Sequence, residues 1–222
     1  MRAWPAAVLL TLLAAPLPAG ESQLSASDQN GNFYSVLNLF TGDHEYINIR
    51  KLNPGGGNLW TQLRDPGVDQ RAAAIVADSA GGVMVASVMR DRGRHVMVLF
   101  HYTADGQYDW GDRVFLDNDA NNDNNPTTAV TDRDGNYYVA GNCRKGARTV
   151  ARLWRYDSRG NLVWWREYDN NFNNTYARGL QVDLSGNAYL SVESVQSQTS
   201  YSGQYNLLTV TFDTNGNQVS VR

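Results

Sequence analysis

The sequence is poor in the residues that build disulfide frameworks, metal centres and acid–base sites. It holds one cysteine, Cys143, and three histidines, His44, His95 and His101. One cysteine excludes an internal disulfide framework and any zinc site with several cysteine ligands. We expect Cys143 to be a buried free thiol, because an exposed thiol in an oxidising compartment would risk cross-linking.

Lysine and glutamate are also scarce, with two and four residues among 222. Both are common on exposed helix surfaces, so a helical protein is not expected. The chain is instead rich in turn formers, with 22 Asn, 18 Asp and 20 Gly. Asn and Asp bond their own main chain, and glycine adopts positive φ without strain. This composition predicts an all-β protein with many tight turns.

The charge balance does not favour a nucleic-acid binder. Nineteen Lys and Arg residues stand against 22 Asp and Glu, which gives a formal net charge of -3. Proteins that bind nucleic acid mainly through phosphate neutralisation carry a clear excess of basic residues. We therefore expect no nucleic-acid partner.

Residues 1–19 have the pattern of a secretory signal peptide. Arg2 supplies a short positive end, the stretch 6–17 is apolar, and small residues follow it. The run is too short and too interrupted by proline to span a bilayer, which takes about 20 apolar residues. We predict cleavage near Ala19, with cleavage after Gly20 and an uncleaved anchor as alternatives. The mature chain, 20–222, is then exported to the periplasm or secreted, with no membrane span.

An internal repeat organises the rest of the chain. A turn of the form Asp-x-x-Gly recurs at spacings of 50, 54 and 51 residues, each time between two β-prone runs. Its copies begin and end at Asp28 and Gly31, Asp78 and Gly81, Asp132 and Gly135, and Asp183 and Gly186. This is a hairpin signal in which the aspartate caps backbone N–H groups. Because a catalytic acid is seldom needed four times, we interpret these residues as structural.

A second turn recurs within each unit and is followed in three units by a tryptophan. The three are Trp60, Trp110 and Trp164, whereas the fourth unit has Val219 near that place. We expect these tryptophans to pack between units.

Each unit of about 50 residues therefore offers four strands joined by hairpins, which is the signature of a β-propeller blade. The predicted fold is a propeller of four four-stranded antiparallel blades, at about 23–63, 72–115, 127–168 and 177–222. We favour a ring closed by packing of the first blade on the fourth. The alternative is an open arc whose exposed faces are covered by a second copy in a homodimer.

The unit resembles the SBBP-type β-propeller repeat of bacterial secreted and surface proteins. The resemblance is carried best by Asp132-Arg-Asp-Gly135-Asn136-Tyr-Tyr138-Val139-Ala-Gly141 and by Tyr156-Asp157-Ser-Arg-Gly160-Asn161-Leu-Val-Trp164. It covers essentially the whole mature chain and departs in the first unit, where Asn53-Pro54-Gly55 replaces the second turn. It implies a propeller and an envelope or extracellular location, but no activity. The Ser-x-Asp-x-Gly-x-Thr-Trp box of sialidase-type propellers is absent.

A loop rich in Asn and Asp lies between the second and third units. Asp117, Asp119 and Asn121 stand at alternate positions, as the first ligands of an EF-hand-like loop do, with Asp123 next. However, Asn122 stands at the position of the loop glycine and Thr128 at that of the bidentate glutamate. Such runs are usually solvated loops. Calcium is therefore a candidate ligand, and no other cofactor is expected.

A similar connector follows Asp169 and contains Phe172 and Asn173. Together the two connectors make a loop face rich in amides and aromatic rings, which suits a protein or carbohydrate partner. Trp165 should point away from Trp164 and is the better candidate for an exposed contact. His101 stands at the place of Lys51 and Arg155, and we interpret all three as solvated surface residues.

No acid–base pair, no nucleophile with a histidine partner and no phosphate-binding loop can be recognised. We therefore predict no catalytic residues. The expected function is that of a secreted binding or scaffold module for a protein or glycan, or a structural envelope subunit. The alternative is a small secreted hydrolase or lyase that uses carboxylates in a central cleft.

Overall fold

The computed structural model describes residues 23–91, 93–115, 123–171, 173–195 and 205–222. These residues form sixteen strands and contain no helix that could span a membrane. The first blade comprises β1 (Gln23–Ser27), β2 (Phe33–Phe40), β3 (Glu45–Leu52) and β4 (Asn58–Arg64). The second comprises β5 (Gln70–Ala77), β6 (Val83–Asp91), β7 (Arg94–Tyr102) and β8 (Tyr108–Phe115). The third comprises β9 (Asn124–Thr131), β10 (Tyr137–Lys145), β11 (Arg148–Tyr156) and β12 (Leu162–Tyr168). The fourth comprises β13 (Asn174–Val182), β14 (Ala188–Val195), β15 (Tyr205–Phe212) and β16 (Gln218–Val221).

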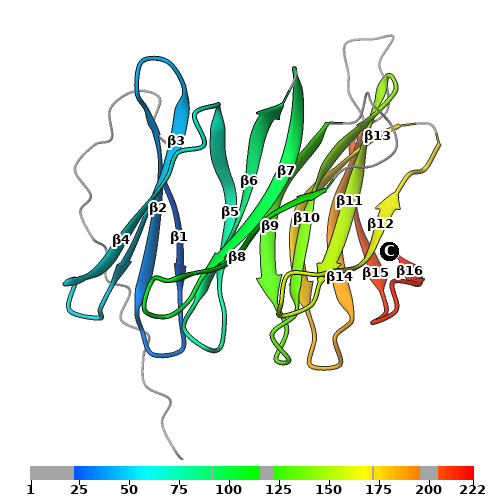
Figure 1. The fold of residues 1–222 in the computed structure, drawn as a ribbon. Helices are drawn as coiled ribbons and strands as arrows, with labels where there is room; N and C mark the ends of the chain where they lie inside the picture. Colours follow the sequence, from blue (N-terminus) through cyan, green and yellow to red (C-terminus); the bar gives the residue numbers. More distant parts are fainter. Residues whose placement is uncertain (1–22, 92, 116–122, 172, 196–204) are drawn as a thin grey trace, which may run out of the picture.

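Each blade is a four-stranded antiparallel meander, and the four blades stand side by side in chain order (Figure 1). The predicted all-β architecture of four four-stranded blades is confirmed. Within each blade the first and third hairpin turns lie at one end, which we call the turn end. The second hairpin and the connector to the next blade lie at the other, the connector end.

Aspartates cap the first turn of each blade. In the first blade, Asp28 Oδ1 accepts from the backbone N–H groups of Asn30 and Asn32, both at 2.9 Å. Asp28 Oδ2 accepts from the side-chain amide of Asn32 at 2.8 Å. Gly31 supplies the positive φ, +76°, that closes the turn. The same three contacts recur around Asp132 and Asp183.

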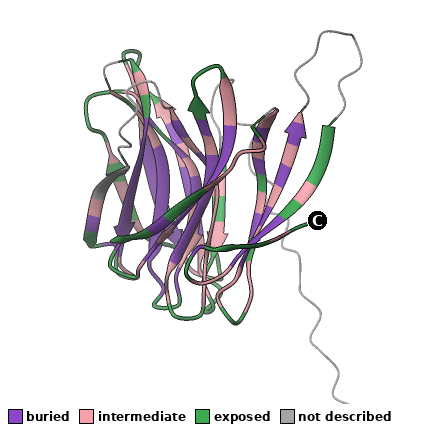
Figure 2. Ribbon diagram, turned by 90° about the vertical axis from the view of Figure 1, so that its right-hand side faces the viewer, coloured by how far each residue is buried: buried purple, intermediate pink, exposed green. Residues whose placement is uncertain are grey.

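Three hydrophobic clusters hold the blades together, one at each junction between neighbours. They centre on the pairs Val36 and Ile49, Ala86 and Leu99, and Ala140 and Leu153, each packed on the next blade. The buried residues follow the middles of the strands in Figure 2, whereas the exposed ones gather at turns and on outer strands. The core of this protein therefore lies between blades, as in other proteins built by stacking repeated units.

A tryptophan of one blade covers a glycine of the next at every junction. A Cβ atom built on Gly106 would lie 2.8 Å from the ring of Trp60. The equivalent distances are 2.6 Å from Gly160 to Trp110 and 2.9 Å from Gly216 to Trp164. Gly56 is the equivalent glycine of the first blade, and a Cβ atom built on it would have no neighbouring atom within 4 Å.

The four blades form an open arc, contrary to the closed ring favoured above. Among the described residues, each inner strand packs on the next from β1 to β13, and no hydrophobic cluster joins the fourth blade to the first.

The two end faces differ in part from the faces at the junctions. Ser35 and Arg50 stand where later blades have the apolar pairs that contact the preceding blade, and Ser191 and Thr209 stand where earlier blades have those that contact the following one. Large apolar side chains are nevertheless exposed on the end blades, among them Leu63 of the first and Leu207 of the fourth.

Candidate functional site

The junctions differ most at one position of the third strand. Lys51, His101, Arg155 and Thr211 pair with equivalent residues of the second strand in the four blades. The expectation that the first three are solvated was wrong, since Lys51 is 4% exposed, His101 is 6% exposed and Arg155 is half-buried. Their side chains point toward the following blade and are covered by the tryptophan of their own blade.

In the first and third junctions this residue is a long cation that ties one blade to the next. Lys51 Nζ donates to the carbonyl oxygens of Gly81 at 2.8 Å and Ala104 at 3.0 Å. Arg155 Nη1 donates to the carbonyl oxygen of Thr214 at 3.0 Å. Trp60 and Trp164 donate to the same Ala104 and Thr214 oxygens, both at 3.0 Å. The cation thus fills the space beside the tryptophan at each of these two junctions.

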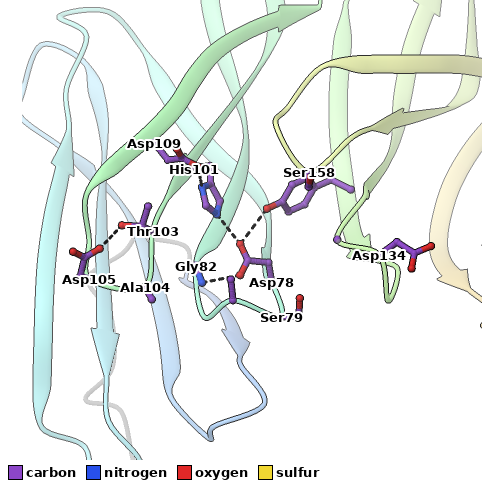
Figure 3. A pocket seen from close by; sticks show the side chains of 13 residues that line it. Asp78, Ser79, Gly82, His101, Thr103, Ala104, Asp105, Asp109, Asp134 and Ser158 are labelled. Atoms are coloured by element: carbon purple, nitrogen blue, oxygen red, sulfur yellow. Dashed lines mark hydrogen bonds and ion pairs between the residues drawn. The ribbon is translucent and has the colours of Figure 1, made fainter.

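In the middle junction the shorter His101 stays with its own blade (Figure 3). Its Nε2 lies 2.7 Å from Asp78 Oδ2, and its Nδ1 lies 3.1 Å from Asp109 Oδ2. Tyr137 of the third blade donates its hydroxyl to Asp78 Oδ2 at 3.1 Å. The imidazole stacks on Trp110 with ring centroids 5.3 Å apart and planes 14° apart. The histidine is therefore fixed from both edges and from one face.

Gly82 makes this arrangement possible. In the other three first turns the equivalent residue is an asparagine whose amide binds the second oxygen of the capping aspartate. Gly82 has no such amide, so Asp78 Oδ2 is available to His101 and Tyr137. A Cβ on Gly82 would lie 2.6 Å from His101 Nε2 and 2.8 Å from Asp78 Oδ2. Two departures from the repeat, at positions 82 and 101, thus build the site.

The hydrogen bonds determine the charges of the group. Burial alone would raise the pKa of Asp78, but the bonds from His101, Gly82 and Tyr137 outweigh it and hold that pKa below its usual value. Burial and the neighbouring Asp78 carboxylate raise the pKa of Tyr137 well above its usual value, so the phenol remains a donor. Ionised carboxylates can only accept hydrogen bonds. Each nitrogen of His101 faces a carboxylate oxygen, and Asp78, which is held ionised, offers Nε2 an acceptor.

A pocket of about 450 Å³ opens beside this group at the turn end. Asp78, His101, Asp109 and Tyr137 line it. Turn residues of both blades complete the wall: Ser79, Ala80, Gly82, Thr103, Ala104, Asp105, Asp134, Gly135 and Ser158. The Asp109 side chain is 48% exposed, and Asp105 and Asp134 are also exposed. The pocket is therefore acidic at its mouth.

The polar atoms of His101 and Asp78 are engaged within the site itself. Both nitrogens of His101 are held by carboxylates, so neither is free to activate a hydroxyl nucleophile. Asp78 accepts from Gly82, His101 and Tyr137 and is held ionised, which does not suit a general acid. In the part of the chain that the structure describes, no three His, Cys, Asp or Glu side chains are grouped to hold a metal ion.

Asp78 and Gly135, predicted as turn residues, line this pocket, whereas the ligand and calcium candidates that the structure describes lie elsewhere. Asp117, Asp119, Asn121 and Phe172 lie outside the described residues. Asp123, at the connector end, accepts from the backbone N–H of His95 at 2.9 Å. Asn173 donates its amide to Ser194 Oγ at 3.3 Å, also at the connector end. Trp165 is 36% exposed, with the guanidinium of Arg152 4.4 Å from its ring centroid. Cys143 is a buried free thiol, as expected.

The connector end carries its own ion-pair cluster around Asp169. Arg148 binds this carboxylate through two nitrogens, at 2.6 and 3.2 Å, and Lys145 lies 3.3 Å from it. The hydrogen bonds from Arg148 lower the pKa of Asp169 to about 2. The cluster links the second hairpin of the third blade to the start of its connector.

Acid should weaken this cluster in a defined range. A carboxyl with a lowered pKa stabilises the fold above its unfolded value, and that contribution is lost as pH falls through the folded value. We expect Asp169 to contribute about 2 kcal/mol that disappears between about pH 4 and about pH 2. Urea unfolding of the wild type and Asp169→Asn across that range tests this. The difference between the two proteins should shrink toward low pH, and a constant difference would refute the assignment.

Comparison with known proteins supports the fold. No family model and no curated protein matches the sequence. Among solved structures, the chain is similar to one described as a subtype N11 neuraminidase-like protein of A/flat-faced bat/Peru/033/2010 (H18N11). The TM-score is 0.55 and the sequence identity 11%, over 89% of this chain and 50% of the other. The present chain thus spans half of that protein, and at this identity the likeness concerns the fold alone.

Proposed function

We propose that this chain is a non-catalytic binding module that engages a protein or carbohydrate partner. One observation carries the proposal: the one pocket-lining histidine, His101, has both nitrogens held by carboxylates. Fixed side chains of this kind favour affinity, because they lose little conformational entropy when a ligand binds. A hydrolase that relied on His101 would instead need at least one of its nitrogens free to move a proton.

The turn end is the face on which we place the contact. Eight tight turns lie there, and the pocket opens among those of the second and third blades. This differs from the connector face that the sequence favoured, where Asp123 and Asn173 are engaged by their own neighbours. The signal-like segment 1–19 supports an exported module, so the partner belongs to the cell envelope or the surroundings.

A paired binding and activity assay tests the function. Mature protein is applied to glycan and peptide arrays, and the same preparation is incubated with chromogenic glycosides and esters. We expect binding to a definable class of ligands and no chromophore release above the buffer rate. Hydrolysis that disappears in Asp109→Asn would refute the proposal and favour the carboxylate-dependent enzyme.

A further inference from the structure

We propose that the pocket between the second and third blades binds the primary ammonium group of a lysine side chain presented by a protein partner. The proposal rests on the binding function given above and names the chemistry of the ligand. Its basis is a comparison of equivalent places within this one chain. At the first junction the space is filled by a lysine of the protein itself, and at the middle junction it is open.

The surroundings of Lys51 show what the open space offers. Its ammonium contacts the carbonyl oxygens of Gly81 and Ala104 at 2.8 and 3.0 Å, with the Asp28 carboxylate at 3.7 Å. By repeat position, the equivalents of these three residues at the middle junction are Gly135, Ser158 and Asp78. All three line the pocket. The middle junction therefore retains the residues that surround an ammonium group, whereas His101 has replaced the lysine.

The third junction repeats the observation with a different cation. Arg155 donates to the Thr214 carbonyl, and Thr214 is the equivalent of Ser158 and Ala104. Thus the chain places a basic side chain at this point in both junctions that flank the pocket. A third basic group, delivered from outside, would complete the pattern.

Charge favours the same occupant. Two carboxylates, Asp78 and Asp109, flank His101 in the wall of the pocket. Asp105 and Asp134 add two more negative charges to the wall, and no Lys or Arg lines the pocket. An ammonium group donates three hydrogen bonds and accepts none, which matches carbonyl and carboxylate acceptors. Charge-assisted contacts of this kind are roughly twice as strong as neutral ones.

The test uses a lysine side chain with its backbone charges removed, Nα-acetyl-lysine methylamide, titrated into mature protein by NMR. We expect saturable shifts of the His101 ring and of the Gly135 and Ser158 amides. The analogue acetylated at Nε lacks the charge and should bind at least about tenfold more weakly. Calcium chloride serves as a second probe and should leave the same signals unmoved.

Three variants distinguish a loss of binding caused by a change in the pocket from a loss caused by unfolding. His101→Lys should place a lysine where Lys51 stands in the first junction, fill the space and abolish binding. His95→Lys makes the same change on the exposed start of β7, far from the pocket, and should bind as the wild type does. Asp109→Asn, at a half-exposed position, should weaken binding about tenfold without unfolding the protein.

Each other outcome counts against the proposal. Equal binding by His101→Lys and the wild type would overturn it, as would shifts produced by calcium and not by the amine. Failure of the lysine probe while the protein still binds a glycan on the arrays would overturn the lysine pocket and leave the binding module standing. Failure of both would overturn the proposed function as well.

Discussion

Replacing Gly160 by alanine is expected to destabilise the protein by about 3 kcal/mol. About 1 kcal/mol follows from the positive φ of +75°, which a residue with a Cβ tolerates poorly. About 2 kcal/mol more follows because the new methyl group would lie 2.6 Å from the ring of Trp110, which the junction holds in place. Equilibrium unfolding in urea measures the loss.

Gly56→Ala is the matched control for this variant. Gly56 occupies the same turn of the first blade with φ +83°, and nothing lies within 4 Å of the added Cβ. It should therefore lose about 1 kcal/mol, the backbone part alone. Equal losses in the two variants would mean that the tryptophan does not press on the following blade, and the account of the junctions would fail.

The second large effect concerns Asp78, whose replacement by alanine should cost about 3 kcal/mol. The change removes the acceptor of Gly82 N–H and Tyr137 O–H and takes one of its two carboxylate partners from the buried ring of His101. Leaving these buried polar groups without their acceptor costs more stability than removing a turn cap alone. The same variant should lose the ligand-induced shifts of the pocket residues.

Asp132→Ala provides the comparison, because Asp132 caps the equivalent turn of the third blade by accepting from backbone N–H groups and from Asn136. Its loss should be about 1 kcal/mol, typical of a cap. The pKa of Asp78 in the folded protein lies below its ordinary value of 3.8. The extra stability that Asp78 contributes is therefore present above about pH 3.8 and is lost as the pH falls through the folded-state pKa. Identical losses at neutral pH would show that Asp78 is only another cap.

Local signals in the sequence predicted the blades, because each hairpin is specified by residues a few positions apart. Asp28, Asp132 and Asp183 bond the backbone within their own turns, so their spacing alone reveals them. The pocket could not be predicted from local signals, because residues of the second and third blades line it together. His101 is buried because Trp110 and Tyr137 cover it, and Tyr137 belongs to the next blade.

Two signals for the site were nevertheless present in the repeat. Gly82 stands where the other three turns have asparagine, and His101 stands where the neighbouring blades have Lys51 and Arg155. Their role became clear only from the contacts between blades, because Lys51 and Arg155 donate hydrogen bonds to the following blade. The open arc was likewise hidden, although Ser191 and Thr209 already broke the apolar pattern of the last blade.

Small-angle X-ray scattering of the mature chain tests the central claim most directly, because one measurement gives both mass and shape. Each blade packs on the next, and no hydrophobic cluster among the described residues joins the fourth blade to the first, which predicts the mass of one chain and the profile of an open four-blade arc. A mass of two chains, or the profile of a closed disc, would contradict it, because the end faces would then be joined.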